Sequence, residues 1–196
     1  MRLLILGLAV LGLGACNSAL ETSSLSASDI AQASTTPTAF QTEAFDALIP
    51  LIGKTFRGTP VTDDENAPAD IQKWSWALGG NAILIQHAIE DGSYGGDSYV
   101  YKDAATGGLV YVYITSAGFR TEGTITVAED GSFTAEEDVK GHPSITKVRS
   151  TSHLDIDGPG TMTSEYLDNG VWVQGHAFDY LATDEALPLI KVQTSE

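Results

Sequence analysis

The sequence predicts an all-β protein: an up-and-down antiparallel β-barrel of about ten strands, preceded by one short N-terminal helix. From Lys54 onward, apolar and polar residues alternate with period two, as they do in strands that bury one face. Turn residues recur about every 8 to 12 positions, and no second helical stretch is visible. Because a meander of this size loses its exposed edges most easily by closing on itself, a barrel is favoured over a sandwich.

The first element of the domain is expected to be the short helix. Order should begin near Phe40, and Thr42 offers a side chain that can cap the helix. Phe45 and Leu48 then fall at helical spacing, and Pro50 ends the helix.

The strands follow from the turns between them. The strongest turn signal is Asn169-Gly170, because a type I′ turn requires positive φ at both central residues and this pair tolerates it best. Strands are expected near residues 54–60, 72–78, 81–90, 95–103, 108–116, 119–128, 132–140, 144–154, 160–168 and 171–181.

The N-terminus is organised as an export signal. Arg2 supplies a positive charge, and residues 3–13 form an apolar run that is too short to span a bilayer. The run ends in Leu13-Gly14-Ala15-Cys16, which resembles the lipobox of bacterial lipoproteins. The resemblance implies that residues 1–15 are a signal peptide and that the thiol of Cys16 receives a diacylglycerol, whose acyl chains are fatty acids such as palmitate. The alternative is an ordinary secretory peptide with a chance cysteine.

The resemblance also implies a location in the cell envelope, with the membrane as a partner through the lipid anchor. Asn17 stands where some bacteria place the Asp that retains a lipoprotein in the inner membrane, so the outer membrane, facing the periplasm, is preferred. Residues 16–39 are rich in Ser, Thr and Ala and lack a periodic apolar pattern, which predicts a disordered tether. Residues 40–196 then form the barrel domain, expected to be a monomer.

Charge and cysteine content exclude some function classes. The net charge is −16, and removing the signal peptide with its one charge, Arg2, takes it to −17. A surface this acidic repels phosphate backbones, so a nucleic acid partner is not expected. Cys16 is the only cysteine, so no disulfide can form within the chain.

A family resemblance begins where the helix runs into the first strand. The stretch Leu48-Ile49-Pro50-Leu51-Ile52-Gly53-Lys54-Thr55-Phe56-Arg57-Gly58 resembles the opening of bacterial lipocalin-like and fatty-acid-binding-protein-like domains. Those domains have Gly-x-x-aromatic-x-Gly in the first strand; here Phe56 replaces the usual Trp, and Thr59-Pro60 departs from the glycine-rich continuation. The resemblance implies a calycin-like barrel with a cavity for an apolar ligand.

Aromatic residues concentrate on single strand faces, which favours a ligand cavity. Trp74 and Trp76 share a face, as do Tyr111 and Tyr113. In the last strand, strict alternation places Trp172, His176 and Phe178 together. A solid core lined by the same rings remains the alternative.

Two arginines lie within expected strands. Arg120 and Arg149 resemble the buried arginines with which fatty-acid-binding relatives hold a ligand carboxylate. The alternative is that both point outward and pair with surface carboxylates. The candidate ligand-binding residues are therefore Trp74, Trp76, Tyr111, Tyr113, Arg120, Arg149, Trp172, His176 and Phe178.

No short motif for catalysis or metal binding is present. The four histidines are not in a metal-binding doublet, and there is no Gly-x-Ser-x-Gly elbow. His87 shares a face with isoleucines and is expected to be a satisfied core residue. Residues 136–138 form an acidic run that is expected to be a solvated face, and Asp155-Ile156-Asp157-Gly158 is better explained by a hairpin than by a calcium loop. We assign no catalytic residue and no metal site.

The sequence favours a lipid-anchored barrel that binds a small apolar or amphiphilic ligand in the cell envelope without catalysis. The rival hypothesis is a structural or interaction lipoprotein with a solid barrel and a protein partner. An enzyme comes third. No cofactor is expected, although His176 could bond a neighbour, anchor a ligand, or bind haem as in the ten-stranded relatives called nitrobindins.

Overall fold

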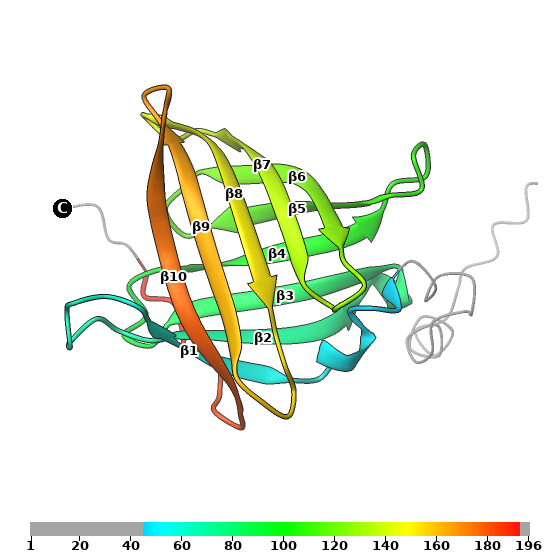
Figure 1. The fold of residues 1–196 in the computed structure, drawn as a ribbon, viewed down its shortest axis with the longest axis horizontal. Coiled ribbons are helices and arrows are strands. Elements are labelled where there is room, and N and C mark those ends of the chain that lie inside the picture. Colours follow the sequence, from blue (N-terminus) through cyan, green and yellow to red (C-terminus); the bar gives the residue numbers. More distant parts are fainter. Residues whose placement is uncertain (1–44, 193–196) are drawn as a thin grey trace, which may run out of the picture. The chain divides into compact units, whose positions relative to one another are not determined.

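The computed structural model describes residues 45–192. The expected signal peptide, Cys16, the tether and the cap at Thr42 all lie outside the described residues. The described chain forms ten antiparallel strands, and β1 pairs with β10 to close a barrel (Figure 1). The strands are β1 (Thr55–Pro60), β2 (Asp70–Ala77), β3 (Ala82–Ile89), β4 (Gly95–Lys102), β5 (Leu109–Thr115), β6 (Arg120–Val127), β7 (Phe133–Lys140), β8 (Ile145–His153), β9 (Gly160–Asp168) and β10 (Val171–Thr183).

The predicted fold class is confirmed, and each strand boundary lies within two residues of its predicted position. The turn chemistry explains this agreement. At the β9–β10 turn, for example, φ is 47° at Asn169 and 81° at Gly170, as the type I′ turn requires.

The prediction of a short N-terminal helix is wrong for the part that is described. The chain from Phe45 makes turns and one 3-10 helix, η2 (Ile49–Leu51), and it becomes extended at Ile52. A second 3-10 turn, η3 (Leu78–Gly80), joins β2 to β3. The buried residues Phe45, Leu48 and Leu51 are spaced by three, which fits the three residues per turn of a 3-10 helix. No helix within residues 45–192 is long and apolar enough to cross a membrane.

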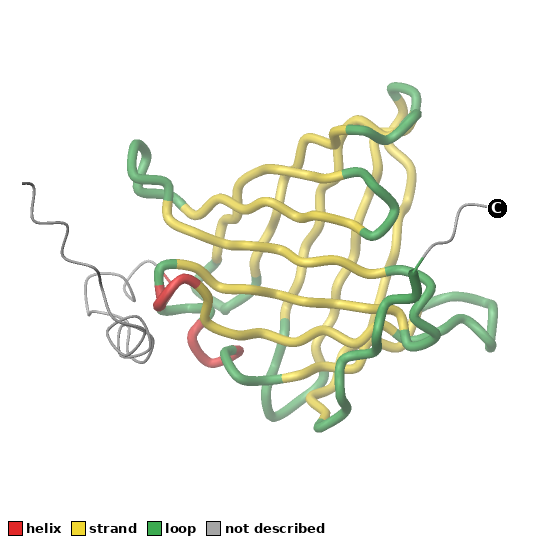
Figure 2. The backbone as a smooth tube through the Cα atoms, turned by 180° about the vertical axis from the view of Figure 1, so that it is seen from behind, coloured by secondary structure: helices red, strands yellow, loops and turns green. Residues whose placement is uncertain are grey.

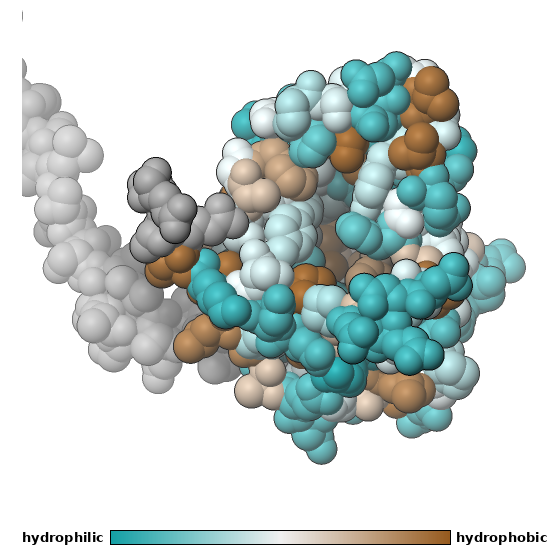
Figure 3. All heavy atoms as spheres, turned by 90° about the vertical axis from the view of Figure 1, so that its left-hand side faces the viewer, coloured by the Kyte–Doolittle hydropathy of each residue, from teal (hydrophilic) through white to brown (hydrophobic). Residues whose placement is uncertain are grey.

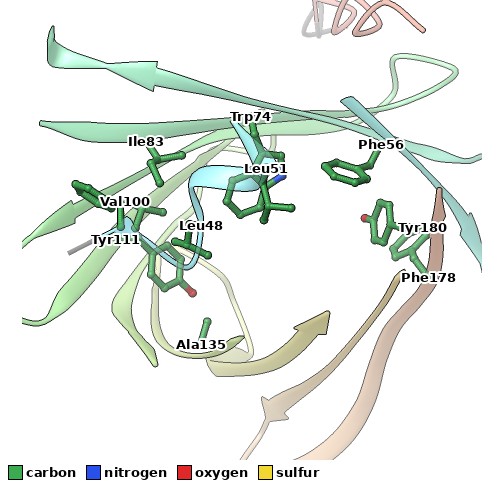
Figure 4. Packing of buried hydrophobic residues seen from close by; sticks show 11 residues of the cluster. Leu48, Leu51, Phe56, Trp74, Ile83, Val100, Tyr111, Ala135, Phe178 and Tyr180 are labelled. Carbon is green, nitrogen blue, oxygen red and sulfur yellow. The ribbon is translucent and has the colours of Figure 1, made fainter. Parts of the chain in front are cut away.

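The strands of the two halves of the barrel cross at a steep angle. In Figure 1, β2 to β5 run roughly horizontally, whereas β8 to β10 run steeply from top to bottom. The same crossing is visible from behind in Figure 2. Leu48 and Leu51 enter the space between the two halves and pack with side chains from both (Figure 4). The buried apolar cluster consists of Phe45, Leu48, Leu51, Phe56, Trp74, Ile83, Val100, Tyr111, Ala135, Phe178 and Tyr180.

A β-bulge in β10 breaks the alternation expected for the last strand. Gln174 pairs with Glu165 and Ala177 pairs with Thr163, so Gly175 and His176 lie opposite a single residue of β9. The extra residue reverses the inward and outward positions along β10, so Trp172 and His176 point to opposite faces of the strand. The expectation that these two side chains share a face with Phe178 is corrected: Trp172 lies outside the barrel.

Candidate functional site: the polar half of the barrel interior

Cross-strand pairing defines which side chains face the interior, because residues paired on neighbouring strands share a face. The inward residues near the N-terminal segment are tightly packed: Phe56, Ile83 and Val100 are each 0% exposed. Elsewhere the inward side chains are less covered: Tyr113 and Tyr166 are partly buried, and His176 is exposed. Figure 3 shows the molecule hollowed on one face, with hydrophobic residues among the walls of the hollow. The interior is therefore solid on one side and open on the other.

A chain of hydrogen bonds runs through the interior from β10 to the loop before β4. The buried Asp70 carboxylate accepts a hydrogen bond from the Tyr180 hydroxyl at 2.7 Å, and its other oxygen lies 2.7 Å from Nδ1 of His87. Nε2 of His87 lies 2.7 Å from the Tyr113 hydroxyl, which is 2.8 Å from the hydroxyl of Tyr94. The predicted satisfied core histidine, His87, is thus bonded at both ring nitrogens.

The hydrogen atoms of this hydrogen-bonded network can be placed in two ways. If Tyr113 donates to Tyr94, both nitrogens of His87 must donate, so the ring is an imidazolium paired with the Asp70 carboxylate. If the two tyrosine protons point the other way, His87 is neutral and accepts from Tyr113. The donor directions along this network are therefore coupled, because reversing the two tyrosine hydroxyls changes Nε2 of His87 from donor to acceptor.

Glu137 is a second interior carboxyl group. It lies on β7 between two apolar inward neighbours, Ala135 and Val139, and it accepts a hydrogen bond from the hydroxyl of buried Thr121. Burial raises the pKa of Glu137, and the hydrogen bonds offset only part of that effect. The protonated acid is consequently favoured more than in water.

Four tyrosines surround the Glu137 carboxyl closely enough to sense its charge. Burial raises the pKa of each hydroxyl, and the charge of Glu137 adds to the rise. These residues are Tyr94, Tyr111, Tyr113 and Tyr166.

Tyr111 has a buried hydroxyl that is not satisfied. The residue is 6% exposed, and its oxygen makes no hydrogen bond of normal geometry, although the Glu137 carboxyl and the Thr121 hydroxyl lie close enough to shift its pKa. Figure 4 shows the ring beside Leu48, with the oxygen directed toward the side of Ala135. A buried polar atom without a hydrogen-bond partner lowers stability by about 1–3 kcal/mol. A polar group of a bound ligand could supply the partner that this oxygen lacks.

His176 faces the same open region. Its ring contacts Tyr166 and Phe178 edge-on or tilted, at centroid distances of 5.7 and 6.1 Å. Among residues 45–192, no side chain hydrogen-bonds to its ring nitrogens; only its backbone oxygen accepts a bond, from Ser164. Burial lowers the pKa of His176 while the charge of Asp70 opposes the shift, so the neutral ring is favoured at neutral pH.

The structure brings six of the nine predicted ligand-binding residues into the interior and leaves three outside. Arg149 lies on the outer face, where Nε is 2.6 Å from Glu165 and the guanidinium stacks over the ring of Trp172 at 4.3 Å. Arg120 is also exposed. These positions agree with the alternative prediction, in which both arginines point outward, and Arg149 pairs with a surface carboxylate as that alternative expects. The six inward residues are Trp74, Trp76, Tyr111, Tyr113, His176 and Phe178.

The two interior carboxyl groups, Asp70 and Glu137, were not predicted from the sequence. Asp70 precedes the expected start of its strand, so nothing marked it as inward. Glu137 lies within the acidic run of residues 136–138, which was expected to be a solvated face. Glu136 and Asp138 are exposed as expected, but Glu137 points inward. The period-two pattern contained the missing signal, because Phe133, Ala135, Glu137 and Val139 alternate with polar residues.

The outer wall carries a separate concavity. An open groove of about 640 Å³ crosses β6 to β10, and most of its lining residues point away from the interior. A row of paired threonines forms part of it: Thr126, Thr134, Thr151 and Thr163. Within residues 45–192, no three His, Cys, Asp or Glu side chains are grouped so that they could hold a metal ion.

Comparison with known proteins finds similar solved structures. The chain matches no protein-family model and no curated protein. Among solved structures, it is similar to the crystal structure of Rv2717c from M. tuberculosis, with 17% sequence identity and a TM-score of 0.47 over 70% of this chain and 95% of that chain. A similarity at this level says nothing about function.

Proposed function

We propose that this protein is a lipid-anchored β-barrel of the cell envelope whose interior binds a small amphiphilic ligand. The observation that carries the proposal is the open half of the interior, where the inward residues Tyr113 and Tyr166 are only partly buried and His176 is exposed. Apolar walls with a few convergent polar groups are typical of small-molecule sites. The solid half, formed by Trp74, Ile83 and Leu48, supplies a rigid base.

A titration with a neutral fluorescent amphiphile tests the proposal. N-phenyl-1-naphthylamine carries no charge and fluoresces when it leaves water. The full chain is expected to bind it with a Kd below about 10 μM, which corresponds to roughly 7 kcal/mol. Absence of binding at that concentration would favour the rival hypothesis, an interaction protein that uses its outer surface.

Haem is a second candidate ligand, because His176 offers a neutral ring without a side-chain hydrogen bond. The ring lies beside Tyr166 and Phe178, which fits a flat aromatic group. Bound haem would supply redox or gas-binding chemistry, and His176 would hold its iron. Titration with hemin should then give a Soret band that His176→Ala loses; an identical band in the variant would exclude this role for His176.

A further inference from the structure

We propose that the polar end of the ligand is a cation, an alkylammonium group that binds between the Glu137 carboxylate and the surrounding tyrosines. This inference rests on the proposed function and names the ligand class for the same interior. It differs from the family resemblance, which implies a fatty acid held by arginine.

The distribution of charge in the barrel excludes a carboxylate clamp. Every lysine of residues 45–192 is exposed, and so are Arg120 and Arg149. Arg57, the least exposed of the basic residues, pairs with Glu90 and Glu185. Two acidic groups, Asp70 and Glu137, face inward. An anionic ligand would therefore enter a site that offers it no lysine or arginine and two carboxyl groups.

The two acidic groups are not equivalent. Both oxygens of Asp70 already have partners, the Tyr180 hydroxyl and Nδ1 of His87. Glu137 has two hydroxyl neighbours, Thr121 and Tyr111, and forms no ion pair among the described residues. The carboxyl group without a nitrogen partner is therefore the one inside the tyrosine cluster.

The tyrosine cluster completes a site for an ammonium ion. Ring faces attract cations through their quadrupole, and the attraction is stronger when water is excluded. An ammonium group has three donors, so it can bond the Glu137 carboxylate and also the unpartnered oxygen of Tyr111. Gly123 pairs with both Tyr111 and Glu137 and separates them without a side chain. A Cβ at Gly123 would lie 1.8 Å from the carbonyl oxygen of Glu136, so only glycine fits there.

The test compares three ligands that have the same apolar tail. Octylammonium, octanoate and octan-1-ol are titrated calorimetrically into the full chain at neutral pH. We expect octylammonium to bind at least about tenfold more tightly than octanol, and octanoate to bind most weakly of the three. In Glu137→Gln the advantage of octylammonium over octanol should disappear. Glu136→Gln is the matched control, because the neighbouring carboxylate is exposed on the outer face.

The outcomes separate the two proposals. If octanol or octanoate binds as tightly as octylammonium, the inference fails while the binding function stands. If none of the three binds, the proposed function fails as well. An octylammonium preference that persists in Glu137→Gln also overturns the inference. The ranking on the unmodified chain decides the question even if the variant does not fold.

Discussion

Individual glycines on the inner face position the tyrosine rings of the polar network. A Cβ at Gly58 would lie 2.5 Å from the ring of Tyr180, and a Cβ at Gly96 would lie 2.5 Å from the ring of Tyr113. Each ring therefore lies across a glycine. The hydroxyl of Tyr180 reaches Asp70 only because the chain leaves this space.

Replacing Gly58 tests this packing. Gly58→Ala should lower the free energy of unfolding by about 1–3 kcal/mol, because the added methyl group displaces the ring of Tyr180. The control is Gly108→Ala, where the nearest atom is 3.6 Å from the added Cβ and the change should stay within about 0.5 kcal/mol. Urea unfolding measures both, and equal effects would refute the role of Gly58.

Glu137 gives a prediction about pH. Burial raises its pKa in the folded chain above the ordinary value of 4.5, so the folded state holds the proton more tightly than the unfolded state does. Stability is then lost as the pH rises from 4.5 through the raised pKa. Glu137→Gln removes this loss, so its free energy of unfolding should match that of the parent near about pH 4 and exceed it at about pH 8. Urea unfolding of the parent and the variant at both pH values measures this, and a stability difference that is the same at both would contradict the prediction.

At the scale of elements, the turns made the strands predictable. Glycine, asparagine and aspartate mark the hairpins, and the two-residue period between them fixes which side chains face inward. The N-terminal segment was misjudged because the spacing of Phe45 and Leu48 fits an α-helix and a 3-10 turn equally well. The bulge was missed although Gly175, within a strand, is a known sign of one. The hydrogen-bonded network could not be predicted, because it joins residues up to 110 positions apart, Asp70 and Tyr180.

The N-terminal segment is expected to contribute to barrel stability through its buried side chains. Leu48 is 1% exposed within the core, so Leu48→Ala should cost about 2–5 kcal/mol. Its neighbour Ile49 is 37% exposed, and Ile49→Ala should change stability by about 0.5 kcal/mol or less. Thermal unfolding followed by circular dichroism compares them. A small effect of Leu48→Ala would mean that the segment does not close the barrel core.

For the whole molecule, the proposal combines a membrane anchor with an acidic barrel. The anchor depends on Cys16, since lipoprotein processing requires acylation of that cysteine. Cys16→Ser should therefore abolish metabolic labelling with palmitate and leave an unprocessed precursor. Equal label in the variant and the parent would contradict the lipoprotein proposal.

The central claim is that the ligand occupies the interior of the barrel and not the groove on its outer wall. Val148 and Thr151 lie on β8 and face opposite sides: Val148 pairs with the inward residues Glu137 and Tyr166, and Thr151 lies in the outer threonine row. The most direct measurement is the affinity of N-phenyl-1-naphthylamine for Val148→Phe and for Thr151→Phe, with folding checked by circular dichroism. We predict that Val148→Phe weakens binding by at least about tenfold and that Thr151→Phe leaves it unchanged. Unchanged binding in a folded Val148→Phe variant, or a loss confined to Thr151→Phe, would contradict the claim.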